Sequence, residues 1–177
     1  MMRVWSKFAA RQARTDVVIA GGGQIGLVLA LALKRAAPGI GVTVIDAAPA
    51  EARAREGRAS TIVAGGQRML AELGVWDTVA GSAERITAME ITDSRTGDAV
   101  RPVFLTFVLA EAGDGDAYVI ADGIVTVALA AAAEAAGIDI VTHARVEDFT
   151  IDGSAVTVRI DDSRTIRARR RFAADGA

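Results

Sequence analysis

The most constraining feature of this sequence is a glycine-rich hexapeptide between two apolar runs. It consists of Gly21, Gly22, Gly23, Gln24, Ile25 and Gly26. Residues 16–20 (DVVIA) before it predict a buried strand, and residues 24–35, apolar almost all round, predict a helix covered on more than one side. Residues 41–46 (GVTVID) predict a second buried strand. Strand, helix and strand within about 30 residues form a right-handed βαβ unit with parallel strands.

Each glycine of this G-x-G-x-x-G motif has a mechanical role in a dinucleotide site. Gly21 permits the tight turn out of the strand, Gly23 lets the backbone approach a pyrophosphate, and Gly26 lets the helix pack closely on the strand. The helix N-terminus adds N–H groups and a partial positive charge. Since glycines are common in this chain, the alternative is a glycine turn that binds nothing. The surrounding strand, helix and strand favour the dinucleotide interpretation.

A carboxylate at the end of the second strand supports the same interpretation. Asp46 lies 20 residues after Gly26, where an acidic side chain accepts hydrogen bonds from the adenosine ribose hydroxyls. A carboxylate at this point repels a 2′-phosphate, so NADP is disfavoured at this site. FAD and NAD both remain open on these residues alone.

The rest of the chain predicts an α/β fold with a Rossmann-like parallel sheet, a β-meander and further antiparallel strands. A polar stretch covers residues 49–58. Helices are expected over residues 64–73 and 124–136, and strands over 86–93, 100–108, 118–121, 138–141, 145–151, 155–160 and 163–168. Loops are expected over 94–98 and 111–116, and Asp152-Gly153 predicts a two-residue hairpin turn. Strand 118–121, helix 124–136 and strand 138–141 suggest a second βαβ-like unit.

Composition excludes several classes of function. The 177 residues suit one domain, or one domain and a piece of a second. With 51% hydrophobic but only 5% aromatic residues, the core must consist of Ala, Val, Leu and Ile. The net charge of −2 gives no global field that favours nucleic acid. The absence of cysteine excludes disulfides, thiolate metal sites and thiol nucleophiles. The longest apolar run, residues 25–33, is far below the roughly 20 residues that span a membrane.

Other charged segments receive structural interpretations. Residues 1–14 form a basic N-terminal tail in which Trp5 and Phe8 lie close to one helical face, so a frayed tail and a membrane-surface helix are the two alternatives. His143, the single histidine, has no nucleophile motif beside it and is expected to be structural. The arginine-rich residues 164–171 are expected to lie partly on the solvent face of a strand.

Several segments resemble FAD-dependent aromatic hydroxylases of the ubiquinone-biosynthesis type, within the single-component flavin monooxygenase class. Residues 16–33 resemble the opening motif of that family, and residues 56–77, which contain LGVW, resemble the segment after its second strand. Residues 86–98 resemble the first strand of its substrate-side sheet, residues 144–149 its adenine segment, and residues 173–177 its Asp-Gly motif. The resemblance covers nearly all of the chain.

The resemblance implies an FAD-binding domain over residues 15–177, with residues 84–120 contributing to a second, antiparallel, substrate-side sheet. It implies that Arg58 reaches the flavin cofactor, that Val146 contacts the adenine, and that Asp175 lies near the pyrophosphate. Asp122 departs from the family, which has Arg, Gln or Asn facing the phosphates at this position. The connection over residues 111–116 is short for the family. The family also continues beyond the Asp-Gly motif, so we expect this chain alone to be incomplete as a hydroxylase.

The implied function is the FAD-binding portion of an NAD(P)H-dependent monooxygenase (an oxidoreductase) that hydroxylates an aromatic or quinone-precursor substrate, with no catalytic side chain required. The alternatives are a catalytically silent dinucleotide-binding or interaction module and an NAD-dependent dehydrogenase. The LGVW segment and the Asp-Gly motif argue against the dehydrogenase. The expected location is cytoplasmic, and peripheral association with the inner face of a membrane is left open. Association with a biosynthetic complex and formation of a homo-oligomer are also left open. Neither a metal nor nucleic acid is expected.

Overall fold

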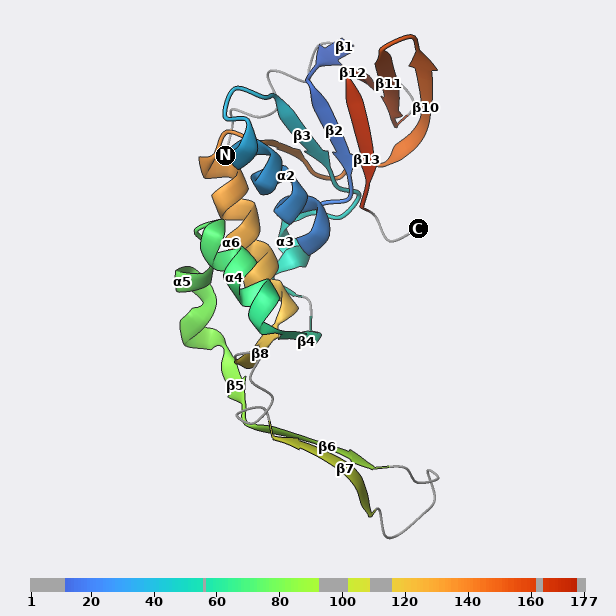
Figure 1. Cartoon of the computed structure of the whole chain (residues 1–177). Coiled ribbons are helices and arrows are strands. Elements are labelled where there is room, and N and C mark those ends of the chain that lie inside the picture. The colour runs from blue at the N-terminus through green and yellow to red at the C-terminus, as the bar shows by residue number, and fades with distance from the viewer. Residues whose placement is uncertain (1–11, 56, 93–101, 109–115, 162–163, 175–177) are drawn as a thin grey trace. The chain divides into compact units, whose positions relative to one another are not determined.

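A computed structural model describes residues 12–55, 57–92, 102–108, 116–161 and 164–174 of the chain (Figure 1). It divides into two compact units. The first unit consists of Met1–Glu56 and Gly123–Ala177, and the second unit of Gly57–Asp122. Among the described residues, no helix is both long and apolar enough to cross a membrane. Trp5 and Phe8 lie outside them, so the membrane-surface helix stays untested.

A parallel sheet forms the centre of the first unit. Its strands are β13 (Arg170–Ala173), β2 (Val17–Ala20), β3 (Val42–Ile45) and β9 (Asp139–Val141), in that order, with all neighbours parallel. Helix α2 (Gln24–Ala36) connects β2 to β3, which confirms the predicted βαβ unit. Short α3 (Ala50–Arg53) follows β3, within the stretch that the sequence predicts only as polar.

Strand β2 is buried on both faces, as expected for a central parallel strand. Val18 belongs to the apolar cluster between the two sheets of this unit, while the next residue, Ile19, faces the start of α2. Both side chains are fully buried. In α2 the buried positions include Leu27, Ala30 and Leu31, the stripe that packs on the sheet.

A β-meander forms the second sheet of the first unit (Figure 1). It contains β10 (Val146–Asp152), β11 (Ala155–Ile160) and β12 (Arg164–Ala168), each antiparallel to the next, as predicted. The end of the predicted N-terminal tail joins this sheet, because β1 (Gln12–Arg14) pairs in parallel with β12. Side chains from both sheets form one apolar cluster: Val18, Ile45, Val141, Ala144, Val158, Ile160, Ile166 and Ala168.

The turn of the β10–β11 hairpin differs from the prediction by one residue. Asp152 pairs with Ala155, so the two-residue loop is Gly153-Ser154 rather than Asp152-Gly153. Gly153 has a φ of 57°. This conformation is most easily adopted by glycine, and a glycine at the first loop position is typical of a type II′ turn.

The second unit is mostly antiparallel. Its elements are β4 (Ala59–Ile62), α4 (Ala64–Glu72), α5 (Trp76–Val79), a 3₁₀ turn (Ala80–Ser82), β5 (Glu84–Ile86), β6 (Ala88–Thr92), β7 (Val103–Val108) and β8 (Ala117–Ala121). The strands form a β4-β8-β5 sheet and a separate β6–β7 hairpin. The predicted hairpin is confirmed. Its loop, 94–98, lies outside the described residues, as does most of the predicted loop 111–116.

The second predicted βαβ-like unit is wrong. Helix α6 (Asp122–Ala135) does connect β8 to β9, but β8 pairs antiparallel with β4 and β5, whereas β9 pairs in parallel with β3. Local apolar patterns predict the strands and the helix but do not determine which strands become neighbours.

The LGVW segment has a structural role within the second unit. Gly74, with a φ of 71°, ends α4 in the left-handed conformation that glycine favours, and Val75 donates its backbone N–H to the carbonyl of Leu70. The chain then turns so that Trp76 packs edge-on against Tyr118, with 5.0 Å between the ring centroids. This motif therefore fixes the start of α5 on the β4-β8-β5 sheet.

Candidate dinucleotide site

The glycine motif forms the turn between β2 and α2 at the carboxyl end of the parallel sheet. Gly21 has a φ of 113°, and its N–H donates to the carbonyl of Ile45 at 2.8 Å. This bond continues the β2–β3 pairing into the turn. The motif therefore lies where parallel strands end, which is where α/β folds bind ligands.

Two glycines of the motif leave no room for a side chain, Gly26 because of backbone and Gly22 because of the Asp46 side chain. A Cβ on Gly26 would collide with the carbonyl oxygen of Gly21 and lie 3.1 Å from its carbonyl carbon. A Cβ on Gly22 would lie 2.7 Å from both Cβ and Cγ of Asp46. These contacts confirm the predicted close packing of helix on strand at Gly26.

Gly23 differs from its neighbours, because a Cβ placed on it meets no atom within 4 Å. It is exposed and has φ −75° and ψ −175°, a backbone conformation open to any residue. It is also the N-cap of α2, with no side-chain cap, and the first turn of the helix contains no acidic residue. Gln24 and Ile25 begin the helix, half-buried and exposed respectively. The protein itself thus leaves space in front of Gly23, as the approach of a pyrophosphate requires.

Asp46 follows β3 directly and lies against the glycine motif, as predicted from its spacing. Its Oδ1 accepts the backbone N–H of Ala48 at 3.1 Å. Its Oδ2 accepts from Nη2 of Arg53 at 2.9 Å, and the carboxylate is only 14% exposed. Its predicted position at the carboxyl end of the strand next to β2 is confirmed, whereas ribose binding stays a prediction.

Sequence reasoning missed Arg53. It lies in a stretch with several arginines, and its spacing carries no signal that distinguishes it from the exposed Arg55. Only the structure shows that α3 places the Arg53 side chain against Asp46, at the end of β3.

Val146, the expected adenine contact, begins β10 at a β-bulge. It pairs with Ile160, but the register shifts before Asp148, so Glu147 has no partner residue on β11. A bulge leaves the extra residue unpaired in the ladder. The Val146 side chain packs against the apolar cluster of the two sheets, so only its backbone suits the predicted adenine contact.

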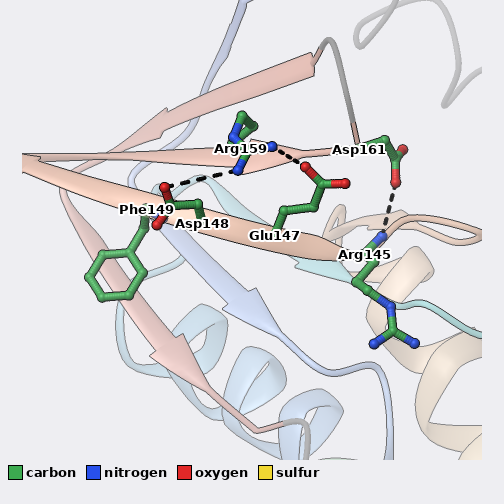
Figure 2. A network of polar contacts seen from close by, with 6 residues as sticks. All are labelled: Arg145, Glu147, Asp148, Phe149, Arg159 and Asp161. Atoms are coloured by element: carbon green, nitrogen blue, oxygen red, sulfur yellow. Dashed lines mark hydrogen bonds and ion pairs between the residues drawn. The ribbon is translucent and has the colours of Figure 1, made fainter.

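A polar network holds this end of the meander (Figure 2). Glu147 forms an ion pair with Arg159, whose other amino group lies 3.9 Å from Asp148. Oδ1 of Asp161 accepts the backbone N–H of Arg145 at 3.3 Å. Figure 2 shows Glu147 and Asp148 on β10 facing Arg159 on β11, and Asp161, which follows β11, beside the backbone of Arg145. The network thus fixes the backbone on both sides of the bulge.

Asp161 gives this region a pH dependence that can be measured. A hydrogen bond from Arg164 is the main cause that lowers the pKa of Asp161 below its ordinary value of 3.8, although burial opposes it. A lowered folded-state pKa stabilises the protein above the unfolded-state pKa, and that stability is lost as the pH falls through the folded value. Because Asp161 is 41% exposed, solvent screening limits the effect to about 0.5 kcal/mol.

We therefore expect Asp161→Asn to lower the free energy of unfolding slightly at neutral pH. The difference from wild type should shrink as the pH falls and disappear once both the folded and the unfolded state bind the proton. Urea denaturation at several pH values measures it. A difference of unchanged size at the acid end would show that the charge of Asp161 is not its cause.

Arg58 and Asp122 lie in the second unit. Nε of Arg58 lies 4.0 Å from Oδ2 of Asp122, and the carbonyl of Arg58 accepts the N–H of Asp122 at 2.9 Å. The arginine side chain is 79% exposed and the carboxylate 10%. Asp122, the departure from the family pattern, is therefore an ion-pair partner of Arg58. The contact of Arg58 with a flavin stays a prediction.

His143 and Asp175 remain from the positions discussed for the sequence. His143 is exposed, with a φ of 54°, in the connection between β9 and β10. Asp175 lies outside the described residues. Within those residues, no group of three or more His, Cys, Asp or Glu side chains is arranged to hold a metal ion.

Known proteins share sequence similarity with this chain. The profile of a family described as "FAD binding domain" matches residues 14–177. The ubiquinone hydroxylase UbiL of Rhodospirillum rubrum is 33% identical over 165 residues, which cover 91% of this chain and 37% of that protein.

Solved structures share the fold. The p-nitrophenol 4-monooxygenase PnpA of Pseudomonas putida aligns with a TM-score of 0.76 and 22% identity, over 93% of this chain and 42% of that one. The flavin-dependent monooxygenase PieE, solved with FAD and substrate, aligns with a TM-score of 0.73 and 21% identity, over 93% and 30%. The chain therefore spans less than half the length of these relatives.

Proposed function

Because the chain belongs to the FAD-binding domain family, we propose that it is the FAD-binding portion of an NAD(P)H-dependent monooxygenase acting on an aromatic ring. A ubiquinone precursor is the proposed substrate class, supported by the similarity to a ubiquinone hydroxylase. The observation that carries the proposal is the open space at Gly23 together with the Asp46 carboxylate against the neighbouring Gly22, at the ends of two parallel strands.

The residues present fit the ADP half of FAD. The bare backbone at Gly23 and the start of α2 would receive the pyrophosphate, and Asp46 would accept hydrogen bonds from the ribose. The backbone at Val146 would contact the adenine. Bound FAD would supply the electron transfer and oxygen chemistry, so the protein contributes binding, orientation and exclusion of water.

The hairpin of β6 and β7 suggests how the rest of such an enzyme would be assembled. Its exposed apolar side chains are Met89, Ile91, Val103, Phe104, Leu105, Phe107 and Val108. A two-stranded sheet with this much exposed apolar surface is marginal alone in water. We propose that it pairs with the polypeptide that the longer relatives carry beyond the matched region, and that hydroxylation requires that polypeptide.

The test is oxygen incorporation. The chain is assayed alone, and joined to the remaining portion of the Rhodospirillum rubrum relative, with a prenylated phenol, FAD, NADH or NADPH, and isotopically labelled oxygen gas. We expect labelled hydroxylated product, matched by NAD(P)H consumption, from the joined protein only. Product without label would contradict a monooxygenase, and turnover by the 177 residues alone would contradict the need for the additional polypeptide.

A further inference from the structure

Arg53 is a buried cation, and the glycine motif gives no reason for its burial. It ends α3 with only 8% of its side chain exposed. Among the described residues, its one ion-pair partner is Asp46, and its Nε is buried without a hydrogen-bond partner. A buried unpaired donor costs about 1–3 kcal/mol, so stability alone does not favour this arrangement. The simplest physical explanation for the buried Arg53 is that it acts on its partner Asp46.

The carboxylate of Asp46 is held from three sides. Gly22 lies against its Cβ and Cγ, the N–H of Ala48 binds Oδ1, and Nη2 of Arg53 binds Oδ2. Each carboxylate oxygen has two lone pairs, so each can still accept another bond. The present bonds therefore fix the orientation of the carboxylate without using all of its capacity to accept hydrogen bonds.

The backbone of Arg53 is fixed in turn. A Cβ on Gly123, at the start of α6, would lie 2.8 Å from the carbonyl oxygen of Arg53 and 3.4 Å from that of Ala54. The first turn of α6 thus packs directly on the end of α3. Arg53 cannot move away from Asp46 without disturbing this packing.

We propose that Arg53 is a positioning residue for ribose recognition. It holds the Asp46 carboxylate in the orientation in which its oxygens accept the two hydroxyls of an adenosine ribose. Without Arg53, the carboxylate can rotate toward solvent, and the ribose bonds would then require it to be ordered again. The inference rests on the proposed function, since it assumes that an ADP moiety binds at the glycine motif.

The test compares ADP with 2′,3′-dideoxy-ADP, which lacks the ribose hydroxyls, by calorimetry on the whole chain. We expect Arg53→Met to weaken ADP about tenfold, the equivalent of one lost charged hydrogen bond. Dideoxy-ADP should change less than about twofold, because it makes no bond to Asp46. Arg55→Met removes the same charge from an exposed position two residues away and should change neither ligand. Circular dichroism monitors folding.

Two further variants test whether the effect of Arg53 depends on its charge and on Asp46. Arg53→Lys retains the charge and should lose less ADP affinity than the methionine variant, so it replaces that variant if the latter does not fold. In an Asp46→Asn background, loss of Arg53 should have no further effect on ADP. Equal weakening of ADP and dideoxy-ADP would overturn the positioning role, since the effect would not pass through the ribose. Failure of wild type to bind ADP at all would instead contradict the proposed function itself.

Discussion

Replacing Gly26 with alanine is expected to lower the free energy of unfolding by about 3 kcal/mol or more. The added Cβ would overlap the carbonyl oxygen of Gly21, which is a backbone atom in the turn between β2 and α2. Relief requires α2 to move away from β2, which opens the apolar contact around Ile19. Overpacking of a core costs about 1–3 kcal/mol when side chains can adjust, and here backbone must move.

Urea denaturation followed by circular dichroism measures this effect. Gly39→Ala is the matched control, because a Cβ at Gly39 meets no atom within 4 Å, and it should change stability by less than about 0.5 kcal/mol. Equal stability of the Gly26 variant and wild type would mean that α2 does not pack on β2 as the structure shows.

Replacing Gly23 with valine is expected to abolish ADP and FAD binding while leaving the fold intact. The extended backbone at Gly23 accepts a β-branched residue without strain, and its Cβ would point into open space. That same space is needed for the pyrophosphate to reach the backbone. We expect affinity to fall by about a hundredfold or more, since the side chain and the phosphate cannot occupy one volume.

Calorimetry with ADP and FAD measures the loss, and thermal unfolding confirms that the variant is folded. Gly39→Val adds the same side chain at another open position and should leave affinity unchanged. If the Gly23 variant retained its affinity for ADP and FAD, the phosphates would not bind at this motif.

The elements around the site could be predicted from sequence because their signals are local and physically strong. Apolar strands of residues 17–20 and 42–45, an apolar helix between them and glycines at the required spacing permit one arrangement. The position of Asp46 follows directly, because adjacent parallel strands end at the same edge of a sheet. The hairpin of β10 and β11 is predictable for the same reason, although its turn lies one residue later than expected.

Features that depend on distant packing could not be predicted. The pairing of β8 with β4 and β5, rather than with β9, is decided by residues far away in the sequence. Arg53 is likewise indistinguishable from neighbouring arginines until the chain turns back at α3. The strand pairing depends on long-range contacts and the position of Arg53 on the turn before α3, and apolar periodicity predicts neither.

We propose that the ADP moiety of FAD binds at the carboxyl ends of β2 and β3. Titration of the isotopically labelled chain with ADP, followed by amide chemical shifts, tests the location directly. We expect the largest shifts at Gly23, Ile25 and Asp46, with little change at Gly39 and Gly41 near the opposite ends of these strands. Shifts concentrated at Gly39 and Gly41 would contradict this location of the ADP site. The absence of any shift at saturating ADP concentrations would also contradict it.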